Sequence, residues 1–367
     1  MINADSPETV VLVHLENLGD FILFSAVIRE TRMNFPDSKL VVVGQRENRS
    51  VVSYCHLVDE WVWIRGHWKP KPGESTGRET SYFFKVAATY IQLLLKYRRK
   101  IDLLIGPDWL LTKNAEQFRS NILFKKANIR GGFANRYLRF DAGKYIAFTH
   151  QVPRNLSVLE MFGLKVTDQK TQTWVLSEES NFFKKDMSIR LDAGPKIVIS
   201  LGAGHARRNY PPKALTEVVS RIHMARPEVC FVVIGPKSLN TTELDNLFSD
   251  LPNTQNLIGK TDIRLAAEII SGATMVIVND SGFAHLAASL EIVTLVISTH
   301  PLDADPWHLH SPNRYHPWMT EYIALQPPHL LHPCVGSCQA QEPHCIEAVL
   351  VEDVLMAALS LLDKTNK

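Results

Sequence analysis

Two polar turns in the second half of the chain have residue types that bind phosphate. The first turn, residues 201–212 (LGAGHARRNYPP), follows an apolar run and contains Arg207 and Arg208. The second, residues 279–282 (NDSG), follows another apolar run and leads into a helix-forming segment. Glycine lets a ligand approach the backbone, the free N–H groups of a helix start attract anions, and arginine donates paired hydrogen bonds to phosphate. Together the turns predict one site for a phosphorylated ligand.

Each turn alone also has a simpler interpretation. Asp280 or Ser281 could merely cap the helix that follows, which is an ordinary role for both residue types. The glycines of the first turn lack the third glycine of the dinucleotide-binding fingerprint, so they are a weak signal by themselves. Two weak signals at the same sheet edge favour the phosphate site.

The elements that would position these turns form a repeated β/α pattern. Apolar runs at 275–278 and 293–297 predict strands around a helix at about 283–290. Strands are also predicted at 196–200 and 229–234. Strands that are apolar throughout and alternate with helices are typical of a parallel sheet covered on both faces.

Asp20 is the corresponding candidate in the first half of the chain. It follows a predicted strand at 10–14 and precedes a helix at about 21–34, with another strand at 40–43. Open α/β sheets bind their ligands at the carboxyl ends of such strands. The alternative role for Asp20 is an N-cap, worth about 1 kcal/mol. The two roles are compatible.

Composition limits the class of protein. The chain has 367 residues, of which 45% are hydrophobic, and this length favours two domains. A net charge of +2 does not favour nucleic acid as a partner, and no apolar run has the length of a membrane span. The amino terminus runs from polar residues into a strand without a basic leader, and five cysteines are an odd number. We therefore expect a reducing, cytoplasmic location.

Residues 65–100 are basic and contain interleaved aromatic side chains. Such a surface could contact anionic lipid headgroups, placing the protein peripherally at the inner face of a membrane, or an anionic acceptor. The more common interpretation of a charge run is a solvated helix face with a loose loop, and the sequence favours it.

Two groups of residues have features of metal sites. Cys334, Cys338 and Cys345, with His332 or His344, offer four zinc-type ligands but lack paired Cys-x2-Cys spacing. A reduced, cysteine-rich turn is the alternative, and the sequence favours it. His308 and His310 also have a metal-like spacing, but no third ligand follows, so a ligand-facing loop is favoured there.

With these segments placed, the chain resembles the heptosyltransferase-like glycosyltransferases of family 9. The resemblance rests on LGDFILFSAVIRETRMNFPDSKL, on LGAGHARRNYPPKAL, on VNDSGFAHLAASLEIVTLVI, and on the cysteine-bearing tail before the last helix. The third motif is the most specific. The sequence departs from the family pattern at Asn209-Tyr210, which replaces Arg-Trp, and at Glu291, which replaces a glycine.

The resemblance implies an α/β GT-B fold with two facing Rossmann-like domains, parallel sheets and a cleft between them. Residues 1–176 would form the acceptor-side domain and residues 177–350 the domain that binds the nucleotide sugar. The polar segment 177–195 would connect them. Residues 351–367 would form a helix that crosses back to the N-terminal domain.

The resemblance also implies an inverting, metal-independent sugar transfer without a cofactor. Asp20 aligns with the general base, and Arg208 aligns with the family's cationic residue, which neutralises the leaving diphosphate. Nucleotide-sugar contacts are implied for Gly19, Gly202, Ala203, Gly204, Arg207, Gly235, Asp280, Ser281, Gly282, Phe283 and His285.

ADP-heptose is the donor most common in the family, and lipopolysaccharide core or another lipid-linked glycan is the implied acceptor. Two alternatives keep the scaffold. A nucleotide-sugar epimerase would need further acid and base carboxylates, which the sequence does not identify. A catalytically silent carbohydrate-binding protein is disfavoured by the intact Asp20, Arg208 and Asp280-Ser281-Gly282 turn.

Overall fold

The computed structural model describes residues 7–64, 88, 92, 96, 103–105, 149–161, 163–177, 194–239, 242–308 and 310–365. The chain divides into an N-terminal unit, Met1–Ala147 with Val152–Gln169, and a C-terminal unit, Phe148–Gln151 with Lys170–Lys367. Thr173 and Ser289 both belong to the C-terminal unit, and their hydroxyl oxygens lie 3.3 Å apart. The expected boundary at 176/177 stays a prediction.

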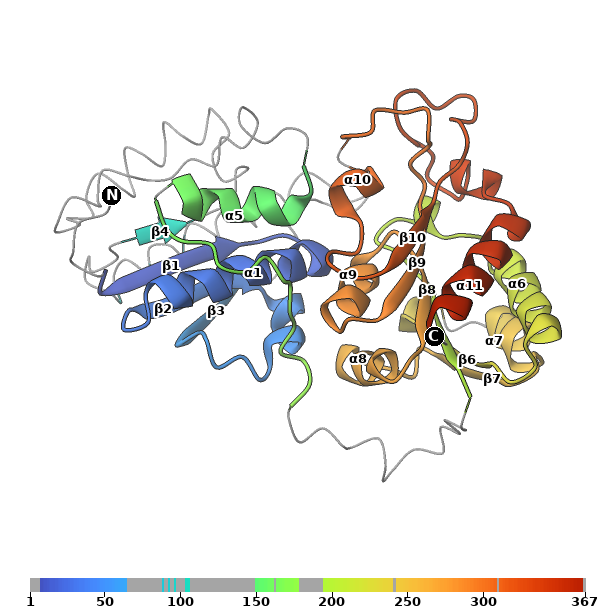
Figure 1. Cartoon of the computed structure of the whole chain (residues 1–367), viewed down its shortest axis with the longest axis horizontal. Helices are drawn as coiled ribbons and strands as arrows, with labels where there is room; N and C mark the ends of the chain where they lie inside the picture. Colours follow the sequence, from blue (N-terminus) through green and yellow to red (C-terminus); the bar gives the residue numbers. More distant parts are fainter. Residues whose placement is uncertain are drawn as a thin grey trace. The chain divides into compact units, whose positions relative to one another are not determined.

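The N-terminal unit is built on a four-stranded parallel sheet in the order β3-β2-β1-β4. Its elements are β1 (Thr9–His14), α1 (Leu18–Asn34), β2 (Lys39–Gln45), the 3₁₀ helix η1 (Arg46–Val52), β3 (Glu60–Ile64), β4 (Leu103–Ile105) and α5 (Gln151–Met161). Every residue of β1 is buried, as its apolar run predicted (Figure 1). The strand order reverses between β1 and β4, so the chain leaving β1 lies at a position where α/β sheets bind ligands.

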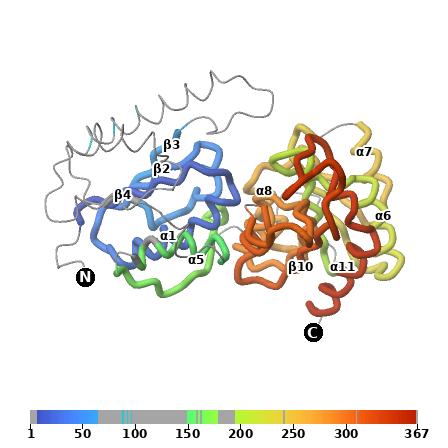
Figure 2. The backbone as a smooth tube through the Cα atoms, turned by 90° about the horizontal axis from the view of Figure 1, so that it is seen from above, coloured from blue at the N-terminus to red at the C-terminus, as the bar shows by residue number. Residues whose placement is uncertain are grey.

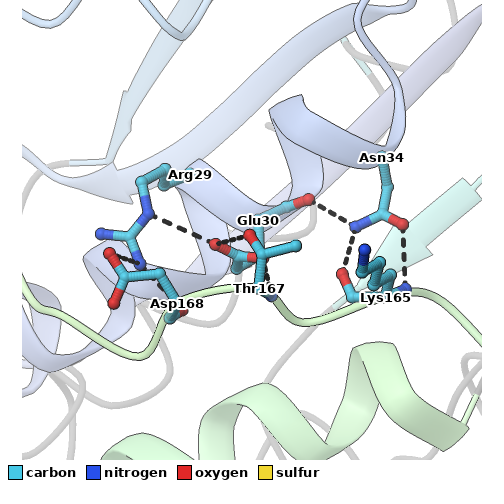
Figure 3. A network of polar contacts seen from close by, with 6 residues as sticks. All are labelled: Arg29, Glu30, Asn34, Lys165, Thr167 and Asp168. Atoms are coloured by element: carbon cyan, nitrogen blue, oxygen red, sulfur yellow. Dashed lines mark hydrogen bonds and ion pairs between the residues drawn. The ribbon is translucent and has the colours of Figure 1, made fainter.

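A polar network centred on the buried Glu30 holds the segment that follows α5 against α1 (Figure 3). The Glu30 carboxylate, fully buried, accepts hydrogen bonds from the Thr167 backbone N–H at 2.6 Å and the Thr167 hydroxyl at 2.9 Å. Asn34 exchanges two hydrogen bonds with the Lys165 backbone, at 2.7 and 3.0 Å. These side chains satisfy backbone groups of a segment that has no strand or helix of its own.

The C-terminal unit contains a six-stranded parallel sheet in the order β10-β9-β8-β5-β6-β7. Its strands are β5 (Lys196–Ser200), β6 (Cys230–Gly235), β7 (Thr254–Ile258), β8 (Met275–Asn279), β9 (Val293–Ile297) and β10 (Tyr322–Leu325). Its α-helices are α6 (Pro212–Ala225), α7 (Thr242–Ser249), α8 (Ile263–Ser271), α9 (Gly282–Ser289), α10 (Pro312–Tyr315) and α11 (Val351–Thr365). Short 3₁₀ helices are η5 (Ala206–Arg208), η6 (Lys237–Leu239) and η7 (Cys345–Ala348).

The last helix, α11, lies beside α6 in the C-terminal unit (Figures 1 and 2). Its apolar face joins the core formed by β5, β6, β8 and α6 through Val354, Ala358, Leu361 and Leu362. The expectation that residues 351–367 cross back to the N-terminal domain stays a prediction.

The basic segment 65–100 lies outside the described residues, apart from Ala88, Gln92 and Lys96. Of these, Lys96 forms an ion pair with Glu60 of β3. Among the helices that the structure describes, none combines the length and apolar character needed to cross a bilayer. Membrane contact through this segment stays a prediction.

Candidate functional site

The two predicted phosphate-binding turns emerge side by side from the sheet of the C-terminal unit. Strands β5 and β8 are neighbours, and Ser200 pairs with Val278 at their carboxyl ends. From this pair the strand order runs to β6 and β7 on one side and to β9 and β10 on the other. Such a reversal leaves a crevice between the two following loops, which is where open α/β sheets bind ligands. The topology therefore brings together residues about 70 positions apart.

Glycine occupies three positions in these loops for different structural reasons. Gly202 has φ of +91°, and a Cβ atom there would lie 2.8 Å from the Pro236 ring, so only glycine fits. A Cβ at Gly235 would lie 3.3 Å from Leu201, so close packing between the two loops accounts for this glycine. Gly204 is exposed, and a Cβ atom there would meet no heavy atom within 4 Å. Of the three, only Gly204 has open space for a ligand at the Cβ position.

The turn after β8 ends in a helix start that can receive an anion. Ser281 is the N-cap of α9, and its hydroxyl accepts a hydrogen bond from the Phe283 N–H at 3.4 Å. Gly282 is the first helical residue, so no side chain covers the backbone there. The structure therefore shows the Ser281 cap, and the anion site expected at the same turn stays a prediction.

Arg208 reaches from η5 to this turn and is the central cation of the site. Its Nη1 lies 3.4 Å from Asp280 Oδ2 and donates to the Asp280 backbone carbonyl, also at 3.4 Å. Its Nη2 lies 2.9 Å from His310 Nδ1. The Arg208 side chain is 19% exposed and that of Asp280 is 18% exposed. A half-buried guanidinium fixed at two points is positioned to bind phosphate without losing much side-chain entropy.

His310 accepts the Arg208 hydrogen bond in its neutral form. Burial, followed by the positive charge of Arg208, lowers the pKa of His310 to about 4. At neutral pH its Nδ1 is therefore an acceptor, and the proton resides on Nε2. This contact places His310 beside Arg208, and the interpretation of 300–318 as a ligand-facing loop stays a prediction.

Asn279 and Tyr210 join the two turns, and neither was predicted as a site residue. Asn279 is 3% exposed, and its Oδ1 accepts a hydrogen bond from the Tyr210 N–H at 2.9 Å. The Tyr210 hydroxyl donates to the Val349 carbonyl at 2.9 Å. The only sequence signal was the departure at Asn209-Tyr210 from the family pattern. The structure shows that the tyrosine at this departure uses its hydroxyl as a donor.

The remaining predicted donor residues lie around this core. Ala203 and Arg207 are half-buried within the turn after β5. His285, on α9, is 6% exposed, and its Nδ1 has no hydrogen-bond partner among the described residues. Burial lowers the pKa of His285 to about 4, so the ring is neutral at physiological pH.

Asp20 lies in the N-terminal unit, in the first turn of α1. The helix begins at Leu18, earlier than the expected start at about residue 21, and Asn17 is the N-cap. Asp20 is therefore the third helical residue and not the cap. It is half-buried, and Gly19 beside it is buried. The helix dipole favours the ionised carboxylate at this position.

The parallel sheets define an α/β protein, and the two predicted phosphate-binding turns lie at one edge of its C-terminal sheet. The sequence profile of glycosyltransferase family 9 (heptosyltransferase) matches residues 111–315, more than half of the chain. The chain therefore belongs to glycosyltransferase family 9, and it is a glycosyltransferase with the GT-B fold. No sequence among curated proteins matches it.

Solved structures of family members resemble the chain over almost its whole length. The family 9 glycosyltransferase from Veillonella parvula has a TM-score of 0.67 at 17% identity, covering 97% of each chain. The E. coli ADP-heptose LPS heptosyltransferase II has a TM-score of 0.63 at 15% identity, covering 98% of this chain and 100% of that one. E. coli heptosyltransferase WaaC, solved with ADP, has a TM-score of 0.61 at 14% identity, covering 96% and 99%. At these identities the likeness establishes the fold.

Proposed function

We propose that the protein transfers a heptose from ADP-heptose to a hydroxyl of a glycan acceptor, with inversion at the anomeric carbon. The observation that carries this proposal is Arg208, held between Asp280 and His310 at the helix start of α9. A cation beside free backbone N–H groups suits the diphosphate of a nucleotide sugar. Family membership, and the ADP bound by a neighbouring heptosyltransferase, support the choice of donor.

In the proposed reaction the acceptor hydroxyl attacks the anomeric carbon in a single displacement. The bond between that carbon and the diphosphate oxygen breaks, and its electron pair stays on the diphosphate. Arg208 and the N–H groups of Ser281, Gly282 and Phe283 stabilise the developing negative charge, so a metal ion is not required. Asp20 takes the proton of the attacking hydroxyl as general base.

The proposed acceptor is a lipid-linked glycan of the lipopolysaccharide-core type. Such an acceptor would be met at the cytoplasmic face of a membrane, where the basic segment 65–100 could contact anionic lipid. The heptosyltransferase named for lipopolysaccharide among the similar structures supports this acceptor class. The donor proposal does not depend on residues 65–100, because the residues that would bind the diphosphate belong to the C-terminal unit.

Asp20→Asn tests the mechanism. The variant keeps the size of the side chain but cannot accept the proton, so we expect sugar transfer to fall at least about 10³-fold while ADP affinity stays within about twofold. Transfer is measured by mass spectrometry of the acceptor, and ADP affinity by calorimetry. Normal transfer by Asp20→Asn would refute the general-base role. Conversion of the nucleotide sugar to an isomer without acceptor would instead identify an epimerase.

A further inference from the structure

Four metal-type ligands meet in the loop before α11, and none of them is a residue used in the proposed reaction. They are Cys334, Cys338, His344 and Cys345. One ligand atom from each lies within 4.8 Å of all the others. The sequence left open whether His332 or His344 would join the cysteines. The structure places His344 in the cluster, whereas His332 is exposed and outside it.

The spacing of these atoms fits a tetrahedral site. With Zn–S near 2.3 Å and Zn–N near 2.1 Å, a tetrahedron separates sulfur from nitrogen by about 3.6 Å. His344 Nδ1 lies 3.6 Å from Cys334 Sγ and 3.4 Å from Cys345 Sγ. A small contraction around one ion would therefore complete the coordination without moving the backbone.

The local backbone is shaped to bring the thiols together. Gly336 has φ of +71°, and the chain reverses there through a bridge between Val335 and Ser337. A glycine at this left-handed position allows the tight turn that returns Cys338 toward Cys334. The Gln339 N–H points at Cys334 Sγ at 3.4 Å. Backbone N–H donors of this kind support thiolates that bind a metal.

We propose that these four residues bind one Zn²⁺ ion in a closed Cys₃His site. Three thiolates and one neutral imidazole are the soft ligand set that zinc favours, and four protein ligands leave no open position for catalysis. Binding would release the thiol protons to solvent. A disulfide would use only two of the three sulfurs and would give His344 no role. The metal is therefore structural, and metal-free sugar transfer remains the proposal for the chemistry.

The position of the cluster indicates what the ion would stabilise. Cys345 is fully buried and begins η7, whose Ile346 belongs to the core of the C-terminal unit. Helix η7 contacts η5, the turn that carries Arg208. The ion would fix the end of the irregular loop and, through η7, support the donor-binding turn.

Metal content tests the proposal. Untagged protein purified with a reducing agent and without chelator should contain about one zinc per chain by plasma mass spectrometry. Cys334→Ser and His344→Asn should lose the zinc, because each removes one of four ligands. Their matched controls are Cys230→Ser, a thiol outside the cluster, and His332→Asn, and both should retain it. Cobalt substitution should add a thiolate-to-metal charge-transfer band in the wild type and the controls alone.

The outcomes separate the alternatives. Because Cys334 and His344 are only half-buried, their variants should fold, which circular dichroism checks. Zinc at full occupancy in both ligand variants, or no zinc and no cobalt band in the wild type, would overturn the proposal. Iron at one per chain would keep the four ligands but overturn the assignment to zinc. Two of the cysteines that react with an alkylating agent only after reduction would show a disulfide, which would also overturn the proposal.

Discussion

Replacing Arg208 with alanine should weaken ADP binding more than any other single change in the C-terminal unit. A hydrogen bond between charged partners contributes about 1.5–3 kcal/mol, which corresponds to roughly a 10- to 150-fold increase in Kd. Two features favour the upper part of this range. The guanidinium is only 19% exposed, and without it the Asp280 carboxylate, 3.4 Å away, would face the diphosphate uncompensated.

The effect of the uncompensated Asp280 carboxylate can be measured separately. Asp280→Asn removes the repelling charge, so Arg208→Ala/Asp280→Asn should recover part of the affinity lost in Arg208→Ala. A coupling free energy of about 1 kcal/mol between the two positions is expected from such contacts. AMP lacks the second phosphate, so its affinity should change less than that of ADP.

Isothermal titration calorimetry with ADP and AMP provides the measurement. Arg226→Ala is the matched control, because Arg226 follows the last residue of α6 and forms an ion pair with Asp363. Arg208 lies before the start of that 14-residue helix, so about 20 Å of helix separates the two sites. Unchanged ADP affinity in a folded Arg208→Ala protein would show that the diphosphate binds elsewhere.

Three further changes test the fold. Glu30→Ala should lower the unfolding free energy of the N-terminal unit by about 1–3 kcal/mol in urea titrations, since the fully buried Glu30 carboxylate accepts both hydrogen bonds from Thr167, and Glu30→Gln should cost less. Glu291 has φ of +62°, a conformation that glycine adopts without strain, so Glu291→Gly should raise the unfolding free energy by about 1 kcal/mol. Glu291→Ala breaks the same exposed ion pair with Lys170 but keeps the strain, so it should not raise the unfolding free energy. Burial lowers the pKa of His14 from 6.5 to about 3, so only the unfolded chain gains a proton between these values and stability falls as pH falls. His14→Leu should remove on the order of 2 kcal/mol of that loss between about pH 7 and pH 4.5, and an unaltered pH profile would contradict the shift.

The central strands of both sheets could be predicted from the sequence, whereas three of the edge strands could not. The run at 293–297 has the bounds of β9, and the run at 196–200 has those of β5. Central parallel strands are covered on both faces and therefore read as continuous apolar runs. Strands β3, β7 and β10 are edge strands and are mostly half-buried. The sequence of β7, TQNLI, begins with three polar residues, so no continuous apolar run marks that strand.

The site was predictable only where the chemistry is local. Arg208, Asp280 and Ser281 were identified because glycine, arginine and a capping residue occur within two short turns. His310 and Asn279 act on residues far along the chain, and their partners follow from the adjacency of β5 and β8. Periodicity and spacing in the sequence do not predict that β5 and β8 are neighbours, since this depends on the order of the strands in the sheet.

Tyr210 explains how the donor-binding turn is fixed in place. Its N–H is bonded to Asn279 at the end of β8, and its hydroxyl is bonded to Val349 after η7. Burial raises the pKa of Tyr210 to about 12, so the hydroxyl stays protonated and remains a donor. The turn that carries Arg208 is thus held on one side by the sheet and on the other by the segment that the proposed zinc site would order. Because both attachments act on the same turn, loss of the zinc should weaken ADP binding even though no zinc ligand is among the residues proposed to bind the nucleotide.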